Sequence, residues 1–154
     1  MEKTQLGFNI YDGNGLYRGE VYAFIYKDAS VIAKWKNAIN RGSLKAQLNA
    51  CKDCLADFVD ELESKGADVA KEWIRECKKA EEARVEVRNY FGSERLASYN
   101  EKIRNKQAIA DELRNEYDNI REDYKEATRL YDYTKSIIGS LNSHPNATIK
   151  PFIY

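Results

Sequence analysis

The sequence predicts an α+β protein, mostly helical, in which a long antiparallel helical hairpin of coiled-coil type stands on a small antiparallel β-sheet. Apolar residues recur at alternating steps of three and four over much of residues 44–141, which is the period of a helix seam. The only prolines, Pro145 and Pro151, lie near the C-terminus, so nothing interrupts long helices. Residues 1–154 are expected to form a single domain, the usual outcome at this length.

The first 27 residues have the pattern of a β-hairpin. Residues 6–10 alternate apolar with small or polar side chains, and residues 20–27 form a β-branched and aromatic run of strand length. Between them, residues 12–15 read Asp-Gly-Asn-Gly, which tolerates positive φ. We expect a turn there, with a loop that reaches Gly19.

The C-terminal residues 147–154 are expected to add a third strand to this hairpin. Ile149, Phe152 and Ile153 supply strand-forming side chains, and Pro151 restricts such a strand to an edge of the sheet. Residues 1–42 and 142–154 would then form a β-containing base.

Helix-capping residues divide the rest of the chain. Asp28 is expected to cap a short helix over residues 29–41, and Ser43 to cap a longer one. The hairpin would occupy residues 43–141, with its turn at residues 91–93, because Gly92 suits a helix C-cap and Ser93 the next N-cap. A second helix over residues 94–141 would be roughly 70 Å long at 1.5 Å per residue.

Folding the two long segments about Gly92 predicts which residues meet. The sizes complement each other, because each bulky ring would face a small residue, as close packing requires. The predicted contacts are Trp73 with Ala110, Gly66 with Tyr117, and Phe58 with Ala127. The alternative is a three-helix bundle in which the first long helix breaks at Gly66.

Composition excludes several classes of protein. Lys plus Arg and Asp plus Glu are both 25, so no bulk charge favours nucleic acid. No window approaches the ~18 apolar residues that span a bilayer, and the N-terminus lacks a signal-peptide pattern. We therefore expect a cytoplasmic protein without membrane contact.

Little material for catalysis or metal binding is present. Cys51 and Cys54 form a CxxC motif inside a helical pattern, but zinc needs two more ligands, and the chain has one further cysteine, Cys77, and one histidine, His144. We interpret the thiols as reduced core residues. No phosphate-binding glycine loop of the Walker or dinucleotide type is present either. The sequence predicts no enzyme, no metal and no cofactor.

Formal neutrality conceals three charge bands. Folded as a hairpin, the chain has a base of +5, a middle of −8 and a tip of +3. The basic tip could receive a phosphate-bearing partner, or it could pair with the acidic middle of another copy in staggered self-association. Both readings remain open from the sequence.

Aromatic and arginine residues provide the candidate contacts, at the hairpin base and at the tip. We expect a non-enzymatic protein–protein interaction, scaffold or inhibitor protein, homo-oligomeric, with another protein as its partner. The alternative is a protein or sponge that binds a small anionic nucleotide at a subunit interface, of a kind that phages encode and that would act in the host cytoplasm; nucleic acid is a further candidate ligand. The candidate binding residues are Tyr17, Arg18, Tyr22, Arg84, Arg88, Tyr90, Phe91 and Arg95.

Overall fold

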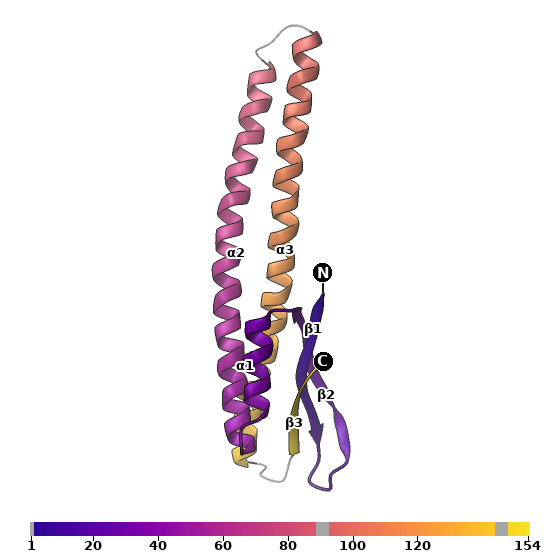
Figure 1. Ribbon diagram of the computed structural model, residues 1–154, viewed down its shortest axis with the longest axis vertical. Coiled ribbons are helices and arrows are strands. Elements are labelled where there is room, and N and C mark those ends of the chain that lie inside the picture. The colour runs from indigo at the N-terminus through magenta and orange to yellow at the C-terminus, as the bar shows by residue number, and fades with distance from the viewer. Residues whose placement is uncertain (1, 89–92, 144–147) are drawn as a thin grey trace. The chain divides into compact units, whose positions relative to one another are not determined.

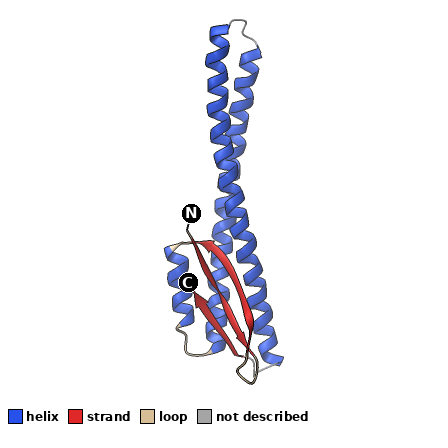
Figure 2. Cartoon of the chain, turned by 90° about the vertical axis from the view of Figure 1, so that its right-hand side faces the viewer, coloured by secondary structure: helices blue, strands red, loops and turns tan. Residues whose placement is uncertain are grey.

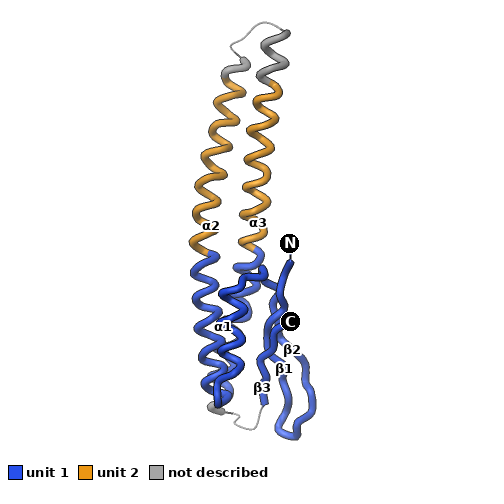
Figure 3. Tube along the Cα trace, viewed as in Figure 1, with its two compact units in different colours: residues 1–62, 122–154 blue, residues 63–121 orange. Residues whose placement is uncertain are grey.

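The computed structural model describes residues 2–88, 93–143 and 148–154, and the side chains at 86–88, 93–99 and 142–143 are not part of that description. Figure 1 shows the elements in chain order: β1 (Lys3–Tyr11), β2 (Tyr17–Tyr26), α1 (Ala29–Ile39), α2 (Leu44–Arg88), α3 (Ser93–Ser143) and β3 (Thr148–Ile153). The chain divides into two compact units (Figure 3): unit 1 comprises residues 1–62 and 122–154, and unit 2 comprises residues 63–121. The predicted α+β, mostly helical class is confirmed.

Unit 1 contains a three-stranded antiparallel sheet in the order β2-β1-β3. Strand β1 is central: Leu6 pairs with Ala23 of β2 on one side and with Ile153 of β3 on the other. The C-terminal strand therefore joins the N-terminal hairpin, as the sequence predicts. It occupies an edge of the sheet, so the N–H that Pro151 lacks is not needed for a ladder hydrogen bond.

The hairpin loop is shorter than predicted. Both the Asn14 and Leu16 backbone N–H groups donate to Asp12 Oδ1, at 2.9 and 3.0 Å, which closes the turn before residue 17. The segment from Tyr17 to Gly19, expected in the loop, instead belongs to β2. Arg18 is one residue more than β1 can pair with, and it forms a bulge: the register changes between Ile10 and Tyr11 of β1. Next to it, Gly19 takes a φ of 134°, which favours glycine.

The inner face of the sheet packs against the helices of unit 1 (Figure 2). Leu6, Phe8, Ala23 and Ile25 are all fully buried, as strand alternation requires of a face that lies on a core. Trp35 of α1 is also fully buried, with its ring 5.6 Å from that of Phe8. The sheet and α1 thus share one apolar core.

Both predicted helix caps are confirmed. Asp28 Oδ1 accepts from the Ser30 and Val31 N–H groups, and Ser43 Oγ accepts from the Ala46 N–H. Helix α1 ends at Ile39, two residues before the predicted end.

In unit 2, α2 and α3 run antiparallel, because residues later in one contact residues earlier in the other. A Cβ at Gly66 would lie 3.5 Å from Ile120 Cγ2, Trp73 stacks on Tyr117, and Arg84 Nη2 donates to Gln107 Oε1. Helix α2 continues through Gly66, which excludes the three-helix bundle broken there. The helices end at Arg88 and begin at Ser93, and predicted turn residues 91 and 92 lie outside the described ranges.

The predicted facing of bulky and small residues in unit 2 is wrong. Trp73 stacks on Tyr117, with ring centroids 6.4 Å apart, although Ala110 was the expected neighbour. Gly66 contacts Ile120 instead of Tyr117. Tyr117 lies seven residues beyond Ala110, whereas Ile120 lies three residues beyond Tyr117. Steps of three, four and seven all keep seam against seam in a heptad pattern. The repeat alone therefore does not determine the offset between the two helices.

Replacement of Gly7 by alanine is expected to destabilise the fold. The added Cβ would lie 2.1 Å from the Val21 carbonyl oxygen and 2.6 Å from Tyr22 Cα, so backbone must move. We expect a loss of about 1–3 kcal/mol in urea unfolding, as for overpacked sites. Gly139→Ala is the control: its Cβ meets nothing within 4 Å, and in a helix it should stabilise by about 0.5–1 kcal/mol. Equal effects of the two substitutions would contradict the model of the sheet.

The cysteines should differ in reactivity. Burial raises the pKa of Cys51 to about 12 and that of Cys54 to about 11, so neither is a thiolate at pH 8. Cys77 is only half-buried. Titration with a thiol reagent should label one cysteine rapidly in the folded protein and all three in denaturant. Cys77→Ala should abolish the rapid phase, and rapid labelling that survives this substitution would show that the CxxC thiols are accessible.

Candidate interaction surface

The outer face of the sheet carries aromatic side chains on all three strands. Strand pairing places Tyr22 and Phe152 on either side of Gly7, and alternation puts Phe24 on the same side as Tyr22. Gly7 contributes no side chain between them. We call this surface the aromatic face, defined by Tyr11, Tyr17, Tyr22, Phe24, Phe152 and Tyr154.

Four of these rings are well exposed to solvent. The exposed fraction is 56% for Tyr17, 36% for Tyr22, 46% for Phe24 and 75% for Tyr154. With Leu16 in the hairpin loop, unit 1 holds five of the eight large exposed apolar side chains found among the described residues. Exposed apolar side chains gathered in one place, unlike scattered ones, mark contact surfaces.

The rings hold one another in place. Tyr22 and Phe24 meet edge to face at 5.4 Å, Tyr11 and Tyr17 do so at 5.8 Å, and Phe152 and Tyr154 pack at 4.9 Å. The first two pairs have the favoured edge-to-face geometry, and the rings of the third are tilted by 38°. A partner would therefore meet side chains that are already ordered, which lowers the entropic cost of binding.

Charges at the aromatic face are balanced. Lys150 Nζ lies 5.4 Å from the centre of the Tyr11 ring, while both Nε and Nη2 of Arg18 contact Asp12 Oδ2 at 3.1 and 2.9 Å. The Leu16 N–H, then the Asn14 N–H and Arg18, hold the pKa of Asp12 below its usual value, so this carboxylate stays ionised beside the guanidinium. Unit 1 as a whole has twelve Lys and Arg against twelve Asp and Glu, so it presents no net charge.

Side chains from α3 bond two backbone groups at the outer edge of β2. On β2, Asp123 Oδ2 accepts from the Tyr26 N–H at 3.1 Å, and Arg129 Nη2 donates to the Tyr22 carbonyl. Trp35 Nε1 donates to the Phe152 carbonyl at 2.8 Å, which ties α1 to β3, but this carbonyl points toward β1 and not to the outer edge. Edge groups that are already bonded make a poor template for an added strand. The face of the sheet is therefore a better contact surface than its β2 edge.

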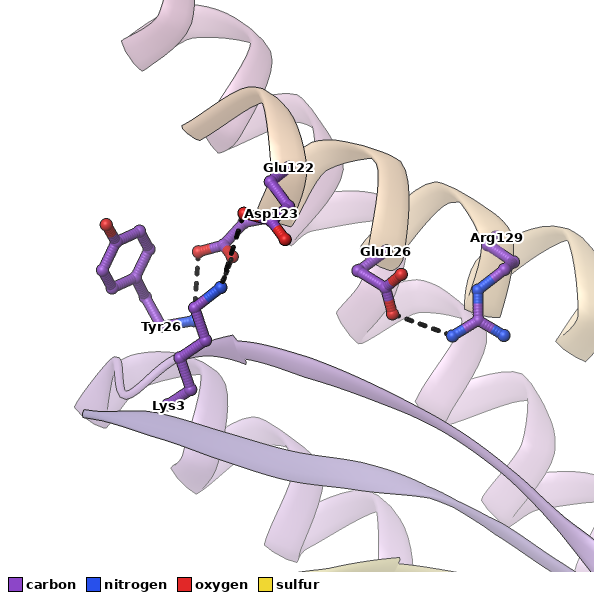
Figure 4. A network of polar contacts seen from close by, with 6 residues as sticks. All are labelled: Lys3, Tyr26, Glu122, Asp123, Glu126 and Arg129. Atoms are coloured by element: carbon purple, nitrogen blue, oxygen red, sulfur yellow. Dashed lines mark hydrogen bonds and ion pairs between the residues drawn. The ribbon is translucent and has the colours of Figure 1, made fainter. Parts of the chain in front are cut away.

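Asp123 is a fully buried carboxylate at the end of β2 (Figure 4). Its Oδ2 binds the Tyr26 N–H, and its Oδ1 lies 3.4 Å from Lys3 Nζ without hydrogen-bonding geometry. Burial raises the pKa of Asp123, and the Tyr26 hydrogen bond and Lys3 only partly offset this effect. Figure 4 also shows Arg129 and Glu126, paired at 2.8 Å, one helical turn further along α3.

Unit 1 contains two hollows that a small ligand could enter. One, of about 310 Å³, lies between the sheet and α3, and Ile10, Ile137, Leu141 and Ile149 make it mostly apolar. Tyr133, Ser136 and Ser140 complete its described lining, which includes no charged side chain, and burial raises the pKa of Tyr133, so its hydroxyl remains neutral. This lining does not suit an anion.

The second hollow, of about 260 Å³, lies between α1 and α2. Its cations, Lys34 and Arg41, are matched by Asp53 and Asp57, and Lys34 Nζ lies 3.5 Å from Asp57 Oδ2. Matched charges of this kind leave little attraction for an anionic nucleotide.

The structure brings together only part of the predicted set of binding residues. Tyr17 and Tyr22 lie on the aromatic face, and Arg18 is the bulge residue beside them. Arg84 belongs to unit 2, where it bonds Gln107 at 2.6 Å and Glu81 at 3.3 Å. Tyr90 and Phe91 lie outside the described residues, as do the side chains of Arg88 and Arg95.

Sequence reasoning missed several residues of this region. Phe24 shares the two-residue period of Tyr22, so strand alternation was a sufficient signal for it. The contributions of Phe152 and Tyr154 required the pairing of β3 with β1. No sequence signal indicated Asp123, because its burial follows from the position of a strand edge distant in sequence.

No protein-family model matches the chain, and no curated protein or solved structure matches it significantly. Across the parts of the chain that the structure describes, no helix combines the length and apolarity needed to cross a membrane. The same described residues contain no cluster of three or more His, Cys, Asp or Glu suited to a metal ion. His144, the single histidine, lies outside them.

Two substitutions of Asp123 should distinguish the effect of its hydrogen bond on stability from the effect of its charge. Asp123→Asn keeps an oxygen for the Tyr26 N–H and should change stability by less than about 1 kcal/mol, whereas Asp123→Ala orphans that N–H and should cost about 1–3 kcal/mol. Chemical denaturation at pH 7 distinguishes them. Equal losses in the two variants would contradict the hydrogen-bonding role.

The stability of wild type relative to Asp123→Asn should depend on pH. The pKa of Asp123 is raised in the folded state above its ordinary 3.8, so the folded state holds the proton more tightly than the unfolded state does. The contribution of Asp123 to stability therefore falls as pH rises from 3.8 through the folded pKa. Asp123→Asn should therefore gain stability relative to wild type as pH rises above 3.8. A constant difference across pH would contradict the raised pKa.

Proposed function

We propose that the chain is a non-enzymatic protein-binding protein, a scaffold or inhibitor, and that the aromatic face of unit 1 is its contact surface. The observation that supports this is the clustering of exposed rings on one uncovered sheet face. Tyrosine and phenylalanine are enriched at protein interfaces because their rigid rings bury large areas at small entropic cost.

The charge of unit 1 favours a protein over a nucleic acid as the partner. Nucleic-acid binding draws most of its affinity from Lys and Arg that neutralise phosphates. Unit 1 carries no net charge, and Arg18, the cation nearest Tyr17 in sequence, is paired with Asp12. The surface therefore offers aromatic area with little attraction for a phosphate backbone.

This proposal places the protein in the cytoplasm, in the host's if a phage encodes it. Cytoplasmic conditions keep thiols reduced, and Cys51, Cys54 and Cys77 are all free.

The test is a paired substitution, Tyr22→Thr with Phe24→Thr. Threonine suits a strand, and both positions are exposed, so stability should change by less than about 1 kcal/mol. In the source cell, tagged wild type should co-purify a protein at near-equal amounts, and the double variant should lose at least about 90% of it, which corresponds to about 1.4 kcal/mol or more of binding free energy.

Ile109→Thr is the matched control, because Ile109 of unit 2 is 46% exposed, as Phe24 is. It should retain the partner. Retention of the partner by the double variant would contradict the proposal. Thermal shift with a panel of nucleotides addresses the alternative ligand: a melting temperature raised by one nucleotide in wild type, and not in the double variant, would replace the protein partner with an anionic nucleotide.

A further inference from the structure

A second exposed stripe lies on α2 within unit 2, the unit coloured orange in Figure 3. Ile74, Lys78, Glu81 and Val85 follow one another at steps of four, three and four, so they fall within an arc of about 60° on the helix surface. Ile74 is 62% exposed and Val85 is 46% exposed. We call these four residues the α2 stripe.

The α2 stripe faces away from the pairing of α2 with α3. The buried residues of α2 in this region are Ala80 and Ala83, which lie on the other side of the helix from Ile74 and Val85. Trp73, which stacks on Tyr117 of α3, belongs to the pairing side as well. The α2 stripe is therefore an apolar and charged surface that the helical pair itself does not use.

The α2 stripe is complementary to the same stripe of a second copy that runs in the opposite direction. If two copies align antiparallel about a two-fold axis between residues 79 and 80, Ile74 of one copy meets Val85 of the other, and Lys78 meets Glu81. Every apolar side chain of the stripe then meets an apolar one and every charge its opposite, and Glu81 would be shared between Lys78 of the other copy and Arg84 of its own chain, 3.3 Å away. Isologous contacts require this self-complementarity, which an arbitrary stripe does not have.

One pair of flanking charges follows the same rule. Arg75 and Glu82 lie on one side of the α2 stripe, and the antiparallel alignment brings Arg75 of one copy near Glu82 of the other. A parallel alignment would instead place Lys78 beside Lys78 and Glu81 beside Glu81, and like charges at such positions are destabilising. The pattern thus discriminates between the two alignments.

We infer that the α2 stripe is a self-association site, at which a second copy of this chain packs antiparallel against α2. The aromatic face, which belongs to unit 1, is not part of this contact. The stripe spans eleven residue steps, or roughly 16 Å of helix, which is small for a protein interface. Its affinity should accordingly be weak, and self-association should depend on protein concentration.

Charge reversal tests the inference in the intact chain. Lys78→Glu places two like-charged pairs in the contact, whereas Lys78→Glu with Glu81→Lys restores both pairs in exchanged form. Both positions are exposed, so the fold should survive, and circular dichroism confirms this. Sedimentation equilibrium at concentrations up to roughly 0.5 mM should show wild type associating to a dimer, the single variant at least about tenfold weaker, and the double variant within about threefold of wild type.

Three outcomes would overturn the inference. Wild type that stays monomeric throughout the concentration range excludes self-association. A dimer unaffected by Lys78→Glu but lost in the variant with threonine at positions 22 and 24 moves the contact to the aromatic face. Failure of the double variant to recover, although it is folded, shows that Lys78 and Glu81 do not pair between copies.

Discussion

Strand β1 hydrogen-bonds along both of its edges, to β2 from the same hairpin and to β3 from the other end of the chain. The terminal contacts extend this pairing, since the Tyr154 N–H donates to the Gln5 carbonyl and Thr4 Oγ1 donates to the Tyr154 carbonyl. A two-stranded hairpin alone is marginally stable in water. The buried positions of β1, Leu6 and Phe8, therefore depend on α3 returning the C-terminus to the sheet.

That arrangement also explains where a contact surface is available. A single sheet layer has two faces and two edges, and helices cover only the inner face. At the β2 edge, the Tyr26 N–H and the Tyr22 carbonyl, which could otherwise pair with another strand, are bonded to Asp123 and Arg129. The outer face is left to solvent, and its rings are the groups with most to gain from burial. Binding by the face instead of the edge follows from this distribution.

The burial of Asp123 illustrates the cost of protecting an edge. The Tyr26 N–H at the end of β2 needs an acceptor, and a carboxylate from α3 supplies one at 3.1 Å. Removing that carboxylate from water disfavours its charge, which is why its pKa is raised despite Lys3 nearby. Edge protection and pH sensitivity thus arise from the same contact.

Local signals predicted much of the fold correctly. The caps at Asp28 and Ser43, the strand alternation of residues 6–10 and the edge position required by Pro151 all depend on neighbours a few residues away, and such preferences act before tertiary structure forms. For the candidate surface, the aromatic run of residues 20–27 was enough to place Tyr22 in a strand, whereas Tyr17 was expected in the hairpin loop and lies in β2.

Other features depend on which distant residues meet, and short-range sequence patterns do not show this. The predicted contacts of Trp73 and Gly66 with α3 were wrong, because offsets of three, four or seven residues all keep apolar seams in contact. The aromatic face required Phe152 to lie beside Gly7, a pairing across most of the chain. The sequence alone thus establishes the types and order of the elements through short-range sterics and hydrogen bonding. Tertiary packing selects one register among those that the sequence pattern allows, and it thereby decides which side chains remain exposed. The registers differ in free energy only once the elements pack, because only then do they bury different side chains and bond different edge groups.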